Sequence, residues 1–215
     1  MRKPTNWSEY QSDPNSFLSK HLFLNLVIKA YLNLLENVNL DKPINILEFG
    51  AGTGYTNKCL SKNLDVKKIT LVDFNKKMLN LSKQTLSDIP SEKEFVEGDF
   101  FKVALSEQYD IVHSQGVIEH FEPEKRRELL ARHFNSTKPG GYCIVYSPTP
   151  TKSYKFFRKA AEILKLWNFP DEVPLDKDTI IKEMESLGFK TLKVNYFWRY
   201  FLTEVGILFQ RKEFI

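Results

Sequence analysis

The sequence predicts an α/β fold in which helices cover both faces of a seven-stranded sheet and the last strand is antiparallel. From Pro43 onward, short β-branched or apolar runs alternate with longer stretches of helical period. This alternation is typical of a parallel sheet with helices on both faces. Only a short stretch separates the last two apolar runs, which favours a hairpin over a helix-linked parallel pair.

Each element follows from its own pattern. A helix over 75–86 places Met78, Leu79 and Leu86 on one side, as a core-facing helix requires, and a second helix covers 124–134. Residues 138–141, Lys-Pro-Gly-Gly, stop that helix and turn the chain into the next strand. The expected strands are Ile44–Phe49, Ile69–Asp73, Glu94–Glu97, Tyr109–His113, Tyr142–Ser147, Thr191–Phe197 and Glu204–Gln210.

Length and composition favour one domain. The 215 residues, 42% hydrophobic and 27% charged, are enough to bury a single core, so residues 1–215 are expected to form one unit. Within it, residues 1–40 precede the sheet and are expected to form an N-terminal helical cap. Residues 148–175 are expected to form a helical insertion after the fifth strand, on the substrate side of the sheet.

The cysteines and the first residues indicate a cytoplasmic protein. Cys59 and Cys143 are far apart and have no paired partners nearby, so they suggest neither a disulfide framework nor a zinc cluster. The N-terminus lacks the apolar core of a signal peptide, and the run Leu22–Leu35 is too polar to span a membrane.

The net charge of +4 is concentrated in one segment. Lys152, Lys155, Arg158 and Lys159 stand together without an acidic residue, and apart from these four the basic and acidic counts are equal. Because the rest of the chain is formally neutral, a broad nucleic-acid surface is not indicated.

A glycine-rich loop follows the first expected strand. Residues 50–54 read Gly-Ala-Gly-Thr-Gly, and glycines allow a backbone to turn tightly and approach a ligand. In an open α/β sheet, ligands bind beyond the carboxyl ends of the strands. By itself the loop fits a simple strand-to-helix turn equally well.

Acidic residues at three successive strand ends give the loop more weight. Glu48 precedes the first glycine and would repel a pyrophosphate while ordering a cationic ligand. Asp73 ends the second strand, where a carboxylate can accept hydrogen bonds from both ribose hydroxyls. Asp99 follows the third strand. Taken singly, each could be a helix cap or a solvated charge.

Together these segments resemble the motifs of class I S-adenosylmethionine-dependent methyltransferases over roughly residues 44–147. The resemblance implies a Rossmann-like fold that binds S-adenosyl-L-methionine and releases S-adenosyl-L-homocysteine. It implies that the loop holds the methionine part, that Asp73 binds the ribose and that Asp99 reaches the adenine. An NAD site is disfavoured because the G-x-G-x-x-G spacing is not met. The cofactor residues so implied are Glu48, Gly50, Ala51, Gly52, Asp73, Phe74, Asp99, Phe100, Ser114 and Gln115, with Tyr10 as a cap over the methionine end.

His120 is the candidate catalytic residue. Methyl transfer from a sulfonium needs mainly orientation, and a general base helps only where the acceptor must lose a proton, a task that suits histidine. A packing or capping role fits a lone histidine equally well. Residues 116–120 also resemble the E-V-I-E-H segment of ubiquinone-pathway and small-RNA O-methyltransferases, in which acidic and histidine side chains help bind a metal. Here the first glutamate is Gly116, so Glu119 and His120 are too few and no metal is predicted.

The insertion after the fifth strand is the candidate acceptor region. Phe157 and Trp167 recur at helical spacing with basic residues elsewhere, so the segment reads as a basic amphipathic helix. As a lid it would line the acceptor site with Tyr154, Phe157 and Trp167. Through 152–167 it could instead contact a membrane surface, or remain an ordinary solvated helix.

The sequence therefore predicts a methyltransferase acting on an oxygen or nitrogen of a small-molecule acceptor, anionic or lipophilic. Two alternatives stay open: an RNA or protein methyltransferase, and a non-catalytic regulatory module that only binds the cofactor. They differ in salt sensitivity and in turnover. The oligomeric state is not determined by the sequence.

Overall fold

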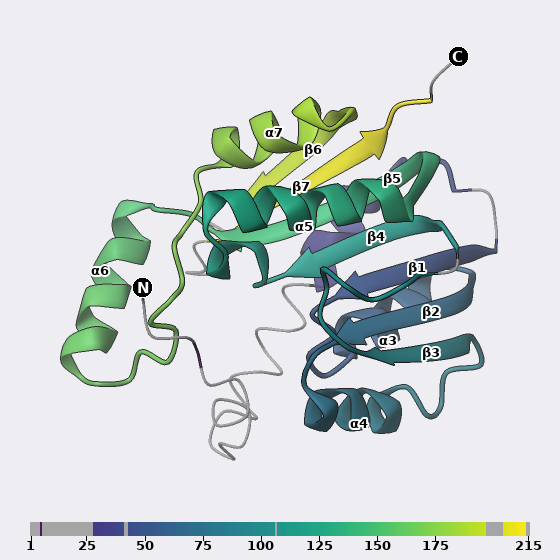
Figure 1. The fold of residues 1–215 in the computed structure, drawn as a ribbon, viewed down its shortest axis with the longest axis horizontal. Coiled ribbons are helices and arrows are strands. Elements are labelled where there is room, and N and C mark those ends of the chain that lie inside the picture. Colours follow the sequence, from purple (N-terminus) through teal and green to yellow (C-terminus); the bar gives the residue numbers. More distant parts are fainter. Residues whose placement is uncertain (1–4, 6–27, 41–42, 106, 197–203, 214–215) are drawn as a thin grey trace.

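The computed structural model describes residues 5, 28–40, 43–105, 107–196 and 204–213. It contains one seven-stranded sheet in the order β3-β2-β1-β4-β5-β7-β6. Strands β1 to β5 are parallel, and β7 is antiparallel to both β5 and β6. The predicted α/β fold and the antiparallel last strand are thereby confirmed (Figure 1). The strands are β1 (Ile44–Phe49), β2 (Val66–Asp73), β3 (Glu92–Glu97), β4 (Tyr109–Gln115), β5 (Thr137–Pro148), β6 (Phe189–Tyr196) and β7 (Glu204–Arg211).

Alternating strand residues face two cores. In β1, Ile44 and Ile46 belong to one buried cluster, whereas Leu47 and Phe49 belong to the other, which is the two-residue period of a strand buried on both faces. The first face is covered by a helical stretch at residues 28–35 together with α3 (Tyr55–Asn63) and α4 (Lys76–Thr85), and the second by α5 (Pro123–Ser136) and α7 (Lys177–Ser186) (Figure 1).

The helix starts follow local capping chemistry. The Asn75 side chain accepts a hydrogen bond from the Lys77 backbone N–H at 3.0 Å, which fixes the start of α4 within one residue of the prediction. Pro123 occupies the first turn of α5, where the missing N–H is not needed. The insertion contains α6 (Lys152–Ile163), which begins after the Thr151 cap and stands at the left of Figure 1, away from α3 and α4.

The turn expected at residues 138–141 lies inside β5. Tyr109 pairs with Thr137 and Ile111 pairs with Tyr142, so four residues of β5 bulge out of the ladder between these pairs. Gly140, with φ of 75°, allows the bulge. The strand therefore begins earlier than its apolar run does.

β1 and β4 lie next to each other at the centre of the sheet. Successive strands run outward from β1 on one side and from β4 on the other, so the strand order reverses between them. A ligand site in such a sheet is expected at this switch point, beyond the carboxyl ends of the strands. None of the helices within the described ranges has both the length and the apolarity to cross a bilayer.

Candidate active site

The loop between β1 and α3 turns on glycines. Gly50, Gly52 and Gly54 have φ of 79°, 49° and 71°, a left-handed conformation that residues with a Cβ rarely adopt. A Cβ on Gly50 would stand 2.5 Å from Cγ2 of Val117, so this position also requires close approach. The Gly50 N–H donates to the Val72 carbonyl at 2.9 Å, which ties the loop to the end of β2.

Asp73 closes the loop from the neighbouring strand. Its carboxylate accepts hydrogen bonds from the Gly52 N–H at 3.3 Å and from the Asn75 N–H at 2.8 Å. Burial raises the pKa of Asp73, although these backbone hydrogen bonds act against the shift. The Asp73 carboxylate at the end of β2 thus links the glycine loop to the start of α4.

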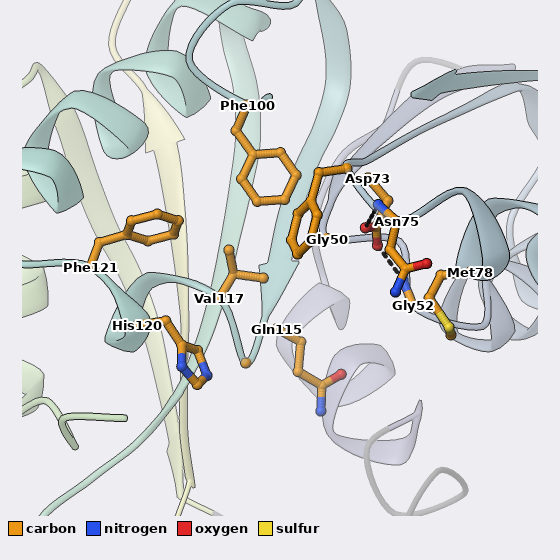
Figure 2. Close-up of a pocket in the computed structure, with 12 residues that line it drawn as sticks. Gly50, Gly52, Asp73, Asn75, Met78, Phe100, Gln115, Val117, His120 and Phe121 are labelled. Atoms are coloured by element: carbon orange, nitrogen blue, oxygen red, sulfur yellow. Dashed lines mark hydrogen bonds between the residues drawn. The ribbon is translucent and has the colours of Figure 1, made fainter. Parts of the chain in front are cut away.

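A pocket of about 150 Å³ opens at this edge of the sheet. Figure 2 shows Asp73, Asn75 and Met78 on one side of it, and His120 and Phe121 on the other. Aromatic and apolar side chains separate a few polar groups, an arrangement typical of small-ligand sites. The pocket is lined by Gly50, Gly52, Asp73, Phe74, Asn75, Met78, Phe100, Gln115, Gly116, Val117, His120 and Phe121.

A buried polar network supports the loop from beneath. The Asn57 amide donates to Glu48 Oε2 at 2.6 Å, and His113 Nδ1 lies 3.7 Å from Glu48 Oε1. The Tyr31 hydroxyl is 3.3 Å from the same ring nitrogen. Burial raises the pKa of Glu48 well above its ordinary range and lowers the pKa of His113 to about 3. Burial therefore favours the neutral form of both groups.

A second network lies under β4. His133 Nε2 is 2.9 Å from the Ser114 hydroxyl, and His133 Nδ1 is 2.8 Å from the Leu129 carbonyl. Burial lowers the pKa of His133 to about 4, so the ring is neutral near pH 7. A neutral ring that donates from Nδ1 to the carbonyl accepts from Ser114 at Nε2.

His120 ends the short helix η2 (Ile118–His120) that follows β4. Its Nδ1 is 2.9 Å from Oδ1 of Asp171, which comes from the segment after α6. Burial acts to raise the pKa of Asp171, but hydrogen bonds from Thr5 and His120 outweigh it and lower that pKa. In a neutral ring, an Nδ1–H that donates to Asp171 leaves the lone pair on Nε2. This is the arrangement that a general base requires.

The insertion is organised around Arg158. The guanidinium donates to the Tyr154 hydroxyl at 3.1 Å and to the Glu172 carbonyl at 2.9 Å, and lies 5.1 Å from the centre of the Trp167 ring. Tyr154 and Trp167 pack edge to face, with 6.1 Å between ring centroids. The Phe157 side chain is half exposed.

Part of the chain is similar in sequence to known methyltransferases. A family model described as a methyltransferase domain matches residues 46–141. The malonyl-[acyl-carrier protein] O-methyltransferase of Priestia megaterium is 27% identical over 110 residues, covering 51% of this chain and 39% of that protein. Its counterpart in Halalkalibacterium halodurans is 30% identical over 132 residues, covering 58% and 47%. The chain thus matches less than half the length of these curated relatives.

A solved methyltransferase structure has a similar fold. The crystal structure of magnesium protoporphyrin IX methyltransferase from Synechocystis PCC 6803 with bound SAH has a TM-score of 0.69 to this structure, at 16% identity, covering 91% of this chain and 84% of that one. Residues 46–141 thus match a methyltransferase domain, and the sheet has the Rossmann-like fold of class I S-adenosylmethionine-dependent methyltransferases. The predicted resemblance to ubiquinone-pathway enzymes stays a prediction.

The pocket brings together most of the residues predicted for the cofactor. Asp99 does not line it: the Asp99 carboxylate is largely exposed and accepts the Phe101 N–H at 3.0 Å. Glu48, Ala51 and Ser114 are buried beside the pocket rather than in its wall. Tyr10 lies outside the described residues. The predicted residues in the wall are Gly50, Gly52, Asp73, Phe74, Phe100 and Gln115, together with the candidate base His120.

Sequence reasoning missed several wall residues of this pocket. Asn75 and Met78 belong to the start of α4, and the Asn cap directly after Asp73 was the signal available for them. Val117 and Phe121 flank η2, and nothing in their spacing marks them. Tyr154, Phe157 and Trp167, predicted to line the acceptor site, belong to α6 and the segment after it and do not line this pocket. Their role in binding an acceptor stays a prediction.

One group of side chains has the donors that a metal could use. Glu119, His120 and Glu172 each offer one atom, and these atoms lie within 4.8 Å of one another. The prediction of no metal assumed that Glu119 and His120 stand alone, whereas the fold adds Glu172 from the insertion. That reason no longer holds, and the absence of a metal stays a prediction.

Proposed function

We propose that this methyltransferase transfers a methyl group from S-adenosyl-L-methionine to an oxygen or nitrogen of a small-molecule acceptor, leaving S-adenosyl-L-homocysteine. The observation that carries the proposal is the single pocket shared by the glycine loop, Asp73 and His120. It combines a backbone cradle, a carboxylate and an oriented histidine at the switch point of the sheet.

The residues present fit the cofactor. Gly50 and Gly52 leave room where a Cβ would be strained, so a ligand can approach the backbone of the loop. Asp73 would accept hydrogen bonds from the ribose hydroxyls, and Phe74 and Phe100 would contact the adenine ring. When bound, the cofactor supplies an activated methyl group on a sulfonium. Solved relatives at similar TM-scores hold this cofactor or its product.

His120 would act on the acceptor rather than on the cofactor. Its Nδ1–H is held by Asp171, so Nε2 accepts a proton from an acceptor hydroxyl or ammonium group. The insertion at 148–175 would cover this side of the pocket and the cap at 1–40 the cofactor, all within one domain. This division rests on the chain order of the segments and on the contact between Asp171 and Thr5.

The alternatives predict different behaviour. An RNA or protein methyltransferase would bind its acceptor in a salt-sensitive way, but the excess basic residues are confined to one helix. A regulatory module would bind the cofactor without turnover. A small molecule is favoured because the pocket is lined by apolar and aromatic groups. An oxygen acceptor is favoured because two curated relatives are named malonyl-[acyl-carrier protein] O-methyltransferases. We also expect a reducing, cytoplasmic setting, since Cys59 and Cys143 are both free thiols.

Two measurements test the function. Isothermal titration with S-adenosyl-L-homocysteine should show one saturable site, and its absence would end the proposal. Incubation with S-adenosyl-L-methionine and a metabolite library, followed by mass spectrometry, should then reveal a product heavier by one CH2 unit. Saturable binding with no product from any metabolite or extract would favour the regulatory module.

A peripheral membrane role for α6 is a second candidate, favoured by its exposed apolar side chains. Phe156 is 70% exposed, Ile163 71% and Leu166 68%, while Lys155 and Lys159 are exposed beside them. Such a helix can bury its apolar side at a headgroup boundary and pair its lysines with anionic lipid. Co-sedimentation with phosphatidylglycerol vesicles should exceed that with phosphatidylcholine vesicles, and equal or absent binding to both would remove this role.

A further inference from the structure

Three carboxylates meet in the interior next to the pocket. Glu119 lies on η2, Glu172 follows α6, and Glu204 is the first residue of β7. Glu119 is 1% exposed and Glu172 is 6% exposed. Side chains of this type are almost never fully buried unless they are paired. Segments far apart in the sequence therefore converge on one acidic cluster, defined here as Glu119, Glu172 and Glu204.

Two members of the acidic cluster each have one carboxylate oxygen without a hydrogen-bond partner among the described residues. Oε2 of Glu119 and Oε2 of Glu204 are buried, and among the described residues neither accepts a hydrogen bond. A buried acceptor without a donor costs about 1 to 3 kcal/mol. Native structures rarely leave such a group without a water, ion or ligand to satisfy it.

The three groups also act on one another. Burial raises the pKa of Glu119, and the charges of Glu172 and Glu204 raise it further. Burial and the charge of Glu172 raise the pKa of Glu204 to about 7. Like charges this close need protons or a cation to neutralise them.

The basic residues nearby do not supply that cation. Within the described ranges, no lysine or arginine forms an ion pair with Glu119, Glu172 or Glu204. Arg158 comes nearest, but its guanidinium donates to the Glu162 carboxylate, the Tyr154 hydroxyl and the Glu172 carbonyl. The lysines of α6 are exposed to solvent. Their positive charges therefore lie on the surface, whereas the carboxylates of the acidic cluster lie in the interior.

The acidic cluster adjoins the wall of the pocket at three places. Gly116 lines the pocket, and a Cβ there would be 3.8 Å from Oε1 of Glu119. Gln115 lines the pocket and hydrogen-bonds to Glu204. His120 lines the pocket, and its ring nitrogen lies within 4.8 Å of the Glu119 and Glu172 oxygens. Figure 2 shows Gln115 and His120 on the same side of Val117.

We propose that the acidic cluster binds a cationic amino group of the acceptor, so that the acceptors of this enzyme are amines. The oxygens that Glu119 and Glu172 offer lie within 4.8 Å of each other, which is compatible with the separation of about 4.6 Å between two acceptors placed tetrahedrally at about 2.8 Å from an ammonium nitrogen. An acceptor presenting a carboxylate would be repelled. The inference rests on the proposed function, because it assigns the acceptor for that same pocket.

The test uses three probes with one ring and different charge: benzylamine, benzyl alcohol and benzoate. Their affinity for the full chain saturated with S-adenosyl-L-homocysteine is measured by ligand-observed NMR near neutral pH. We expect benzylamine, as its ammonium ion, to bind at least about tenfold more tightly than benzoate, with benzyl alcohol between them. Equal affinities, tighter benzoate, or no binding of any probe would overturn the inference. These affinities are measured on the wild-type protein alone.

Variants locate the binding group. Glu119→Gln and Glu204→Gln should each weaken benzylamine by about tenfold while leaving the affinity for S-adenosyl-L-homocysteine unchanged. Glu124→Gln, on the exposed surface of α5, is the matched control and should change neither. If both cluster variants keep the wild-type benzylamine affinity, the inference fails.

A titration with metal ions tests whether the acidic cluster binds a metal instead of an amine. Isothermal titration with Mn²⁺ and Zn²⁺ should show no stoichiometric site. Stoichiometric binding that Glu119→Gln abolishes would make the cluster a metal site and overturn the amine assignment. Failure of S-adenosyl-L-homocysteine to bind, in contrast, would count against the proposed function itself.

Discussion

The two sides of the pocket are built differently. On the side of β1 and β2, the wall comes from consecutive residues at the strand ends: the glycine loop and Asp73, held by backbone hydrogen bonds. On the side of β4, the wall comes from the end of β4 and from residues in and beside η2. The nearby residues Asp171, Glu172 and Glu204 come from the insertion and the last strand. The first side is local in sequence, and the second depends on long-range contacts.

The charges differ in the same way. Asp73 faces the pocket with two backbone N–H donors on its oxygens, so its charge is satisfied inside the protein. Glu119 and Glu204 keep an oxygen without a donor among the described residues. One side is therefore complete without an acceptor, whereas the other has unmet polar capacity. This is the division expected of an enzyme that binds a common cofactor and a particular acceptor.

The largest effect is expected from a substitution on the side of the pocket formed by β1 and β2. Asp73→Ala removes the predicted ribose contact and the support of the Gly52 N–H, so affinity for S-adenosyl-L-homocysteine should fall by about 2 to 4 kcal/mol, or about 30- to 1,000-fold. Isothermal titration measures it. Asp99→Ala is the matched comparison: its carboxylate is exposed and outside the wall, so less than about a threefold change is expected. A larger loss with Asp99→Ala would return that residue to the cofactor site.

The acidic cluster should make the stability of the folded protein depend on pH. Glu204 has a folded-state pKa of about 7 against an ordinary value of 4.5, so the folded protein binds more protons than the unfolded chain between these values. Stability should therefore fall as pH rises from about 5 to 8, by on the order of 3 kcal/mol from this group. Glu204→Gln carries no titrating proton, so its stability relative to wild type should increase over that interval in urea denaturation. A constant difference would mean that Glu204 is already paired.

His120 separates chemistry from cofactor binding. His120→Ala should lower kcat by about a hundredfold with the identified acceptor, since it removes the predicted proton acceptor. The affinity for S-adenosyl-L-homocysteine should stay within about twofold of wild type, because Gly52 and Asp73 lie on the other side of the pocket from His120. Asp171→Asn should shift the pH profile of kcat toward that of His120→Ala. Equal losses of turnover and cofactor affinity would make His120 structural.

The sequence predicted one side of the site far better than the other, for a physical reason. The glycine loop and Asp73 lie at strand ends that the apolar pattern locates, and the carboxyl ends of neighbouring parallel strands meet at one edge. The partnership of His120 with Asp171 joins residues far apart in the chain, and no local period reveals it. The same holds for Glu119 and Glu204.

Strand limits show a related contrast. β1 was predicted at its observed bounds because every residue of its run except Asn45 is buried. β3 begins earlier than predicted, and none of its residues is fully buried, so backbone pairing with β2 rather than hydrophobicity determines its length. Edge strands of this kind leave a weak signal in the sequence.

The smallest effect is expected on α6, outside both sides of the pocket. Phe156 and Ile163 are 70% and 71% exposed, so replacing both by Ser should change the free energy of unfolding by less than about 0.5 kcal/mol. If α6 binds membranes, the same double variant should lose co-sedimentation with phosphatidylglycerol vesicles, because insertion depends on buried apolar area. Turnover of a water-soluble acceptor should be unchanged, which distinguishes a surface contact from a lid over the pocket. A fall in turnover without a change in vesicle binding would instead assign α6 to the acceptor site.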